Sequence, residues 1–411
     1  MLELHNTLSD RLEPFTPLEN GRVLMYHCGP TVKEPINLSK FRSYLLADVL
    51  RRKMEADGNA VVQVMNITDV GHLNEFEEDI IELAAARTGL YAWELVEKEV
   101  KLFHEDRKAL NVLDAHHYPH AREHITDMIE MIEALEKKGC TYQAGGNLYF
   151  DIEKASRLGM LSHRTPEQLT AALAESRTPP HPEKKNALDI DLWRTDIEHQ
   201  RHWPSPWGRG FPGWHVECVA MGRKYLGESF DIHTGAHDNV FPHHECEIAQ
   251  GESLSDKPLA NYWLHSGEVK IDGQPMSLKN RNMVTVHELL EAGFRGAVIR
   301  VALLSVHYSE PLEFSEERAD DAREKVNSVL GFHEYLVDEA GDGTEDPAAV
   351  ESWITEADEA FNSAIDANLD YPAGLKVVTD LTERLEPEDI QNPGNALAAL
   401  RRWDAVLGIL G

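Results

Sequence analysis

Thiol, imidazole and carboxylate side chains gather in two short stretches of the chain. One contains Cys218, and the other, residues 241–247, contains His243 and Glu247. His243 and Glu247 are four residues apart, so on a helix their side chains lie on the same face, one turn apart. Two side chains at this spacing can bind one metal ion, as helical i, i+4 pairs do in zinc sites. The spacing predicts a metal-binding pair, with Cys218 as a third ligand.

A fourth ligand has to come from a distant part of the chain. Cys28, at the end of the first apolar run, is the candidate. Two thiolates, one imidazole and one carboxylate suit Zn²⁺ best, because of ligand softness and tetrahedral geometry. From spacing alone, a group of partly buried His and Cys side chains with a structural role is an equally good interpretation.

The composition is that of an ordinary globular protein. The chain has 411 residues, of which 42% are hydrophobic and 27% are charged, enough for two to four domains and a large core. No apolar run has the length of a membrane span and the N-terminus shows no signal region, so we expect a cytoplasmic protein without a membrane partner. Only four cysteines occur, which favours free thiols or metal ligands over a disulfide framework.

The net charge is strongly negative. Seventy-one acidic residues against forty basic ones give a formal net charge of −31. This charge opposes the approach of a polyanion, so binding of RNA would need a local basic patch. The candidates are basic clusters, each of which also fits an ordinary solvated surface: Arg42 with residues 51–53, residues 184–185 and residues 401–402.

The N-terminal part has the pattern of a strand, a helix and a second strand. Residues 23–28 and 60–67 are apolar runs, and residues 39–56 carry an apolar stripe at helical spacing. Ser39 is the expected N-cap of that helix. The βαβ pattern predicts a parallel sheet, whose ligands bind beyond the carboxyl ends of the strands, where Cys28 falls. The G-x-G-x-x-G dinucleotide fingerprint is absent, which disfavours a nicotinamide enzyme.

The rest of the chain alternates helical and strand patterns. Helical pattern dominates residues 76–139, and a Gly-Gly pair predicts a hairpin over residues 141–150. Residues 230–232 and 262–264 are expected to return to the sheet as strands. From Ser315 onward the pattern is helical again, so we predict an α/β body followed by a helical tail.

Several segments together resemble cysteinyl-tRNA synthetase, a class I aminoacyl-tRNA synthetase, over nearly the whole chain. They are YHCGPTV at 26–32, NITDVGHL at 66–73, GNLYFD at 146–151, SPWG at 205–208, PGWHVEC at 212–218, the run 241–250 and SVHY at 305–308. The resemblance implies an α/β fold of class I synthetase type, with a Rossmann-like parallel sheet, an inserted connective domain and a C-terminal helical bundle. The implied regions are two halves of the catalytic domain at 1–115 and 205–315, the connective region at 116–204 and the bundle at 316–411.

The resemblance also implies a site. The family holds one zinc ion with residues that match Cys28, Cys218, His243 and Glu247. A bound metal favours the thiolate of cysteine, whereas serine lacks that contact, so the ion selects the amino acid rather than performing hydrolysis. Thr31 and Trp214 are the implied contacts to the cysteine substrate.

The two ATP-binding motifs of class I synthetases are altered in this chain. The His-Ile-Gly-His motif aligns with residues 37–40 (NLSK), and the Lys-Met-Ser-Lys-Ser motif aligns with residues 275–279 (PMSLK). The lost groups normally stabilise charge on the α-phosphate and pyrophosphate, so their absence should cost several kcal/mol of barrier. The expected nucleotide contacts for ATP, with Mg²⁺ as its partner, are Asn37, Ser39, Met276 and Ser277. Lys40 and Lys279 are the candidate catalytic cations.

The C-terminal part of the resemblance affects which acceptor is expected. The sequence has no counterpart of the small anticodon-reading module that bacterial cysteinyl synthetases carry, and the cysteine ligase of mycothiol synthesis, which couples cysteine to an amino sugar, lacks it too. The main hypothesis is a cysteinyl-tRNA synthetase-like ligase that binds L-cysteine through zinc, activates it with ATP and transfers it to tRNA or another acceptor. The alternatives are a cysteine ligase for a small amine or carrier protein, and a non-catalytic cysteine-binding paralogue.

Overall fold

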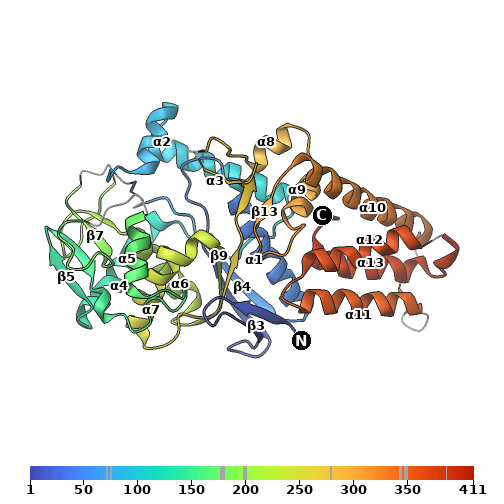
Figure 1. Cartoon of the computed structure of the whole chain (residues 1–411), viewed down its shortest axis with the longest axis horizontal. Coiled ribbons are helices and arrows are strands. Elements are labelled where there is room, and N and C mark those ends of the chain that lie inside the picture. The colour runs from blue at the N-terminus through green and yellow to red at the C-terminus, as the bar shows by residue number, and fades with distance from the viewer. Residues whose placement is uncertain are drawn as a thin grey trace.

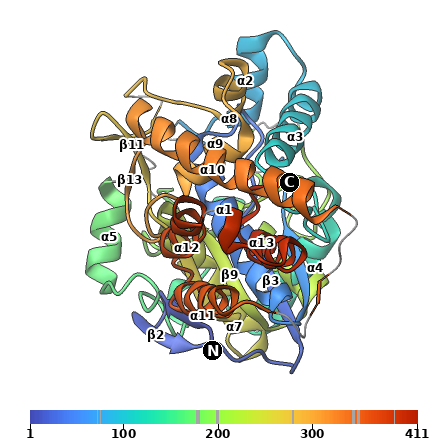
Figure 2. The ribbon, with the colours of Figure 1, turned by 90° about the vertical axis from the view of Figure 1, so that its right-hand side faces the viewer.

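The computed structural model describes residues 1–70, 73–74, 76–175, 181–197, 201–277, 280–341, 345–346, 350–385 and 387–411. A parallel sheet lies at the centre, with a mixed α/β region on one side and a bundle of helices on the other (Figures 1 and 2). Lys279, the second candidate catalytic cation, lies outside the described residues.

The central sheet has four parallel strands in the order β10-β9-β3-β4. Their bounds are β3 Arg22–His27, β4 Ala60–Met65, β9 Phe230–Ala236 and β10 Ala260–Ser266. All four predicted strands are therefore confirmed. β9 is buried along its whole length, as expected of a parallel sheet covered on both faces. One apolar core lies on each face, and the carboxyl ends of the strands meet along one edge.

Helix α1 (Leu38–Ala56) connects β3 to β4 and is almost entirely buried. Its N-cap is Asn37, whose side-chain oxygen accepts a hydrogen bond from the backbone N–H of Lys40 at 3.0 Å. The prediction of Ser39 as the N-cap is wrong, because Ser39 already lies in the first turn. Its hydroxyl instead accepts a hydrogen bond from the backbone N–H of Val269 at 3.3 Å.

An α/β region lies between β4 and β9 along the chain. Its helices are α2 Ile80–Thr88, α3 Ala92–Ala109, η1 Ala121–Glu123, α4 Ile125–Lys137, η2 Ile152–Lys154, α5 Pro166–Glu175 and α6 Trp214–Leu226. Its antiparallel sheet contains β5 Thr141–Ala144, β6 Asn147–Phe150, β7 Ile190–Arg194 and β8 Phe211–Pro212. The predicted hairpin is confirmed. Gly145 and Gly146 turn it with φ of 57° and 88°, the positive values that a two-residue hairpin turn of the primed types needs.

Further strands and helices lie outside these two sheets and the bundle. They are β1 Glu3–Asn6, β2 Arg11–Pro14, η3 His237–Asn239, η4 Val240–His244, α7 Glu245–Ser255, β11 Val269–Ile271, β12 Gln274–Pro275, α8 Val286–Glu291, α9 Gly296–Leu303 and β13 Leu312–Glu313. The bundle contains α10 Glu316–Ala340, α11 Ser352–Asp366, α12 Tyr371–Arg384, η5 Pro387–Asp389 and α13 Pro393–Leu407. The helical tail is thus confirmed, whereas the division into four regions stays a prediction.

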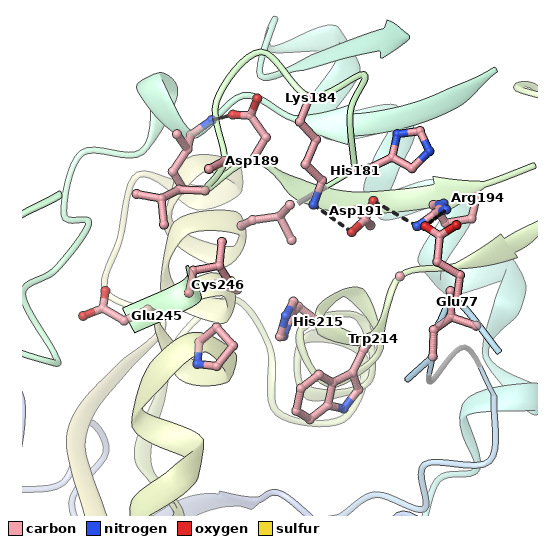
Figure 3. Close-up of a pocket in the computed structure, with 18 of the residues that line it drawn as sticks. Glu77, His181, Lys184, Asp189, Asp191, Arg194, Trp214, His215, Glu245 and Cys246 are labelled. Carbon is pink, nitrogen blue, oxygen red and sulfur yellow. Dashed lines mark hydrogen bonds and ion pairs between the residues drawn. The ribbon is translucent and has the colours of Figure 1, made fainter. Parts of the chain in front are cut away.

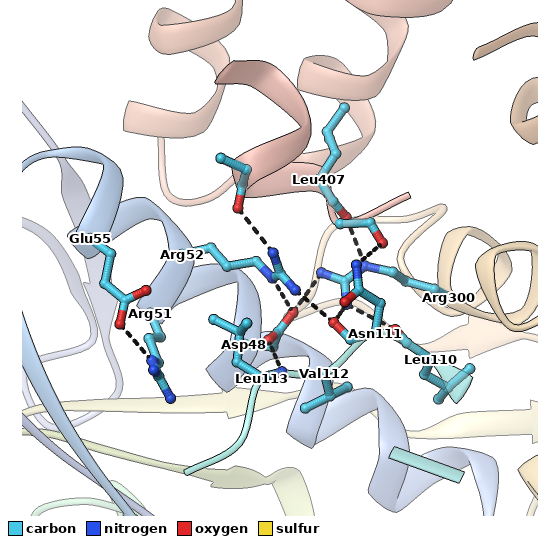
Figure 4. A network of polar contacts seen from close by, with 12 residues as sticks. Asp48, Arg51, Arg52, Glu55, Leu110, Asn111, Val112, Leu113, Arg300 and Leu407 are labelled. Carbon is cyan, nitrogen blue, oxygen red and sulfur yellow. Dashed lines mark hydrogen bonds and ion pairs between the residues drawn. The ribbon is translucent and has the colours of Figure 1, made fainter. Parts of the chain in front are cut away.

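A buried polar network joins α1 to the bundle (Figure 4). Asp48 of α1 pairs with Arg300 of α9 at 2.6 Å and with Arg52 at 2.8 Å. Arg300 donates to the carbonyl of Leu407 and Arg52 donates to that of Ala405, both at the end of α13. These hydrogen bonds therefore connect the end of α13 to the network on α1. Among the helices of the described ranges, none has the length and apolar character needed to cross a lipid bilayer.

Candidate metal site and its cavity

Four side chains predicted as metal ligands meet at the carboxyl edge of the sheet. Cys28 follows β3, Cys218 lies on α6, His243 lies in η4, and Glu247 lies in the first turn of α7. Their ligand atoms all lie within 4.8 Å of one another, and all four residues are buried. His243 Nε2 is 2.8 Å from Glu247 Oε1 and 3.5 Å from Cys218 Sγ, and Cys28 Sγ is 3.5 Å from Glu247 Oε1. The fold brings together residues that are far apart in the sequence.

The donor set fits a zinc ion. With Zn–S near 2.3 Å and Zn–N or Zn–O near 2.0 Å, neighbouring ligand atoms of a tetrahedral site lie roughly 3.3–3.8 Å apart. The pairs Cys218–His243 and Cys28–Glu247 are both 3.5 Å apart, whereas His243 and Glu247, at 2.8 Å, are at hydrogen-bond distance. Two sulfurs, one imidazole nitrogen and one carboxylate oxygen are also the donors that zinc prefers.

A second group overlaps with the first. Cys28, His233, His244 and Glu247 also lie within 4.8 Å of one another, but they share Cys28 and Glu247 with the first group. His233 Nε2 is 2.8 Å from Glu247 Oε2, the oxygen that faces away from His243. His244 lies between Cys28, at 3.2 Å, and His265, at 2.8 Å. These contacts are typical of side chains that orient metal ligands from outside. His233 was not predicted from the sequence, because burial in a strand is its only local feature.

The side chains of the cluster shift one another's pKa values. A hydrogen bond from Cys28, together with the neighbouring His243, lowers the pKa of Cys218 to about 6 despite its burial, whereas burial raises the pKa of Cys28 well above its usual value. Burial alone would raise the pKa of Glu247, but His233 and His243 outweigh the effect of burial and hold this pKa low. Burial alone would also lower the pKa of His243, yet Glu247 and Cys218 raise it to about 10. A proton on His243 thereby offsets the negative charges of Glu247 and Cys218.

The cluster opens into a cavity of about 290 Å³. Besides three of the predicted metal ligands, its lining includes the predicted substrate contacts Thr31 and Trp214, the predicted nucleotide contact Asn37 and the candidate catalytic cation Lys40. The ring of Trp214 stacks on that of His243, with centroids 4.4 Å apart and an interplanar angle of 18°. Lys40 Nζ lies 2.8 Å from both carboxylate oxygens of Asp238, which follows β9 and also lines the cavity. Asp238 was not predicted, because nothing local links it to Lys40.

Three other predicted nucleotide contacts are absent from the lining of this cavity: Ser39, Met276 and Ser277. Ser39 faces Val269, and the side chain of Met276 packs against the core. The backbone N–H of Ser277 donates to Asn282 at 3.0 Å. Their contact with ATP stays a prediction, as does the catalytic role of Lys279.

The part of the chain that forms this site matches a known family. Residues 14–324, more than half of the chain, match the family model described as tRNA synthetases class I (C) catalytic domain. The chain belongs to this family. The predicted family resemblance and the class I α/β fold are therefore both confirmed.

Named relatives and solved structures agree with this membership. The chain is 37% identical to a cysteine--tRNA ligase of Symbiobacterium thermophilum, covering 100% of this chain and 87% of the relative. It is 38% identical to a cysteine--tRNA ligase of Caldicellulosiruptor saccharolyticus, covering 90% and 77%. Its fold is similar to that of a methionyl-tRNA synthetase of Mycobacterium tuberculosis in complex with methionyl-adenylate, with a TM-score of 0.64, 15% identity and coverage of 94% and 90%. It is also similar to the LeuRS of Agrobacterium radiobacter K84 in a ternary complex, with a TM-score of 0.66, 11% identity and coverage of 96% and 84%.

Proposed function

We propose that this synthetase-family protein binds L-cysteine through a zinc ion, activates it with ATP and transfers it to an acceptor. The observation that supports this most directly is the buried cluster of Cys28, Cys218, His243 and Glu247 at one end of a small cavity. The four side chains would hold the ion. A zinc ion held there would offer a free position that favours a thiolate over a hydroxyl group.

The chain's own residues would orient the amino acid. Trp214 closes one side of the cavity and is fixed by its stack on His243. Thr31 lines another part, next to the end of β4, where it bridges to Thr68. A cavity of 290 Å³ is at the small end of the range for ligand sites. It suits a small amino acid better than one with a bulky side chain.

Activation would occur at the mouth of the same cavity. The carboxylate oxygen of cysteine would attack the α-phosphorus of ATP, and pyrophosphate would leave. Lys40 and Asn37 are the cavity residues at the position of the altered first motif. Lys40 is held by Asp238, so binding of ATP with Mg²⁺ would have to compete with this ion pair for the lysine. Ser39, Met276, Ser277 and Lys279 remain proposed further contacts.

Pyrophosphate exchange tests the activation step. Zinc-loaded protein should exchange labelled pyrophosphate into ATP when cysteine is present. Serine should support exchange at least about 100-fold less well, because it lacks the required sulfur contact. The absence of cysteine-dependent exchange would contradict adenylate formation and favour a non-catalytic cysteine-binding protein.

The metal ligands are tested separately. Cys218→Ser should remove the bound zinc and cysteine binding together, measured by metal content and calorimetry. Cys140→Ser is the matched control, because Cys140 is also buried but does not belong to either metal-ligand group. A Cys218→Ser protein that still holds one zinc per chain would show that the ligand assignment is wrong.

The acceptor is the remaining part of the proposal. The relatives are named cysteine--tRNA ligases, so tRNA is the first acceptor to test. A small amine or a carrier protein is the second candidate. The cytoplasmic location expected from the sequence also stays a prediction.

A further inference from the structure

The first basic cluster found in the sequence is buried inside the fold. Arg42 is fully buried and donates to the backbone carbonyls of Leu303 at 3.1 Å and His307 at 2.9 Å. The side chains of residues 51–53 are also buried, and each pairs with a carboxylate of the chain, as Figure 4 shows for Arg51. This cluster is therefore not available to a phosphate ligand.

The other two basic clusters contain cations that are already paired. Lys184 lies 2.9 Å from Asp191 in the wall of a cavity of about 740 Å³, where Figure 3 shows the two side chains facing each other. Arg402 pairs with Glu345 at 3.0 Å and with Asp358 at 3.1 Å. Since a paired cation attracts a further anion less strongly, a phosphate ligand would need cations elsewhere.

The tertiary structure assembles four other cations around one pocket of about 560 Å³. They come from the end of α4, the end of η2, the loop after η2 and the loop between α7 and β10. They are Lys138, Lys154, Arg157 and Lys257. Only two carboxylates of the described residues line the same pocket, Glu252 and Asp256. The pocket is thus cationic, although acidic residues outnumber basic ones by 71 to 40 in the whole chain.

Three of the four cations can reach a ligand. Lys154 is exposed, and within the described ranges its side chain forms no ion pair or hydrogen bond. Lys138 pairs with Asp256 at 2.9 Å and Lys257 pairs with Glu228 at 3.0 Å, but these carboxylates are 85% and 51% exposed. Exposed ion pairs contribute little to stability, so both lysines are able to turn toward an anion.

The fourth cation is fixed, and two hydroxyl groups lie near it. Arg157 lies 3.0 Å from Glu252, whose same oxygen accepts a hydrogen bond from the backbone N–H of Leu259 at 3.3 Å. Ser156 and Ser253 also line the pocket, and in the described part of the chain their hydroxyl groups form no hydrogen bond. Ammonium and hydroxyl groups are donors that phosphate oxygens accept from.

This pocket is separate from the metal-site cavity. Helix α7 carries the predicted metal ligand Glu247 in its first turn and ends at the pocket, with Asp256 as its C-cap. A helix of 11 residues is about 16 Å long. No described residue lines both cavities. A ligand of this pocket is therefore not the ATP of the proposed function.

We propose that the pocket of Lys138, Lys154, Arg157 and Lys257 binds a phosphate group that belongs to a larger molecule. Four cations against two carboxylates supply the charge for a phosphate dianion, and lysine is a common phosphate ligand. The pocket has the size of a site for an organic ligand, so it also has room for the group that carries the phosphate. That group is either a small phosphorylated compound or the backbone of an RNA.

Calorimetric titration of the zinc-loaded full chain with inorganic phosphate and with ribose 5-phosphate tests the proposal. Lys154→Gln/Lys257→Gln should weaken binding of both about tenfold or more, because two charged donors are lost. Lys101→Gln/Lys325→Gln removes the same charge from exposed positions outside the pocket and should leave the affinity unchanged. Equal phosphate affinity in the pocket variant and the wild type overturns the inference.

A second variant should change the affinity in the opposite direction. Asp256→Asn removes the carboxylate that competes for Lys138, and should strengthen phosphate binding about threefold. Asparagine tolerates the positive φ of 58° at this position, so the end of α7 is preserved. An affinity that does not rise contradicts the role of Lys138 in the site.

Bulk tRNA distinguishes the two sources of the phosphate. If the Lys154→Gln/Lys257→Gln variant binds tRNA less tightly, with a salt dependence lower by about two charges, the ligand is an RNA backbone. If it loses ribose 5-phosphate but binds tRNA as the wild type does, the ligand is a small phosphorylated compound. Unchanged binding of all three probes overturns the inference. None of these measurements depends on adenylate formation, so the result is independent of the proposed function.

Discussion

At the residue scale, the proposed metal ligand Glu247 is oriented by side chains outside the group of four. His233 Nε2 is 2.8 Å from the outer oxygen of Glu247, and its ring stacks on Trp263 with centroids 4.5 Å apart. These contacts fix the direction in which Glu247 presents its other oxygen to His243. Because a ligand that is free to rotate binds a metal less tightly, His233 should matter for metal affinity without being a ligand.

Replacing His233 tests this role. His233→Leu should weaken zinc binding about 10- to 100-fold, as loss of an outer partner does, measured by competition with a chelating dye. His233→Gln should lose less, because its amide can still donate to Glu247. His5→Leu, at a position with 41% side-chain exposure, is the control and should change nothing. Equal affinity in His233→Leu and the wild type would contradict the assigned role.

At the element scale, the start of α1 controls one wall of the metal-site cavity. Asn37 caps the helix, and the backbone N–H of Leu38 donates to Val284 at 3.0 Å, which ties this end to the segment after the altered second motif. Lys40, one turn further, reaches Asp238 beyond β9. The first turn of α1 therefore contacts two other segments of the site, one at Val284 and one at Asp238.

Asn37→Ala should lower the free energy of unfolding by about 1 kcal/mol, because the first turn of α1 loses its side-chain acceptor. Urea denaturation followed by circular dichroism measures this change. Asn37→Asp keeps the acceptor oxygen and should remain close to the wild type. Should Asn37→Ala and Asn37→Asp prove equally stable, the cap would contribute nothing measurable.

At the scale of the whole molecule, the network around Asp48 connects the bundle to α1 (Figure 4). Asp48 and Arg300 are both fully buried, and Arg300 donates to Leu407 at the end of α13. Burial would raise the pKa of Asp48, but Arg300, Arg52 and the backbone N–H of Leu113 outweigh burial and hold its pKa below the usual value. The ion pair therefore stabilises the fold only while Asp48 is ionised.

Asp48→Asn should lower stability at neutral pH by about 3 kcal/mol, because it leaves Arg300 buried without its counter-charge. The pKa of Asp48 is depressed in the folded state, so its contribution is complete above the unfolded value of about 3.9 and is lost as the pH falls through the lower, folded value. Thermal unfolding of wild type and variant should thus converge in acid.

The exposed pair Lys376–Asp380 provides the control for this prediction. Asp380→Asn removes a carboxylate with 58% side-chain exposure and should change stability by no more than about 0.5 kcal/mol at any pH. A wild-type advantage over Asp48→Asn that persists unchanged at low pH would contradict the electrostatic explanation.

The sequence by itself determined the features that depend on the spacing of neighbouring residues. The apolar runs predicted β3 and β4, the Gly-Gly pair predicted the hairpin, and the four-residue spacing predicted that His243 and Glu247 would lie together. Each of these depends on a backbone period or on one residue's preferred φ, so neighbours in the chain are sufficient to define them.

Only the tertiary structure decided which distant groups meet. It placed Cys28 next to one oxygen of Glu247 and His233 next to the other, and it paired Lys40 with Asp238. It also gave the cap of α1 to Asn37, because the chain has to arrive extended from the loop after β3. Such contacts depend on how strands are ordered in the sheet and how its two faces are covered, which no local period specifies.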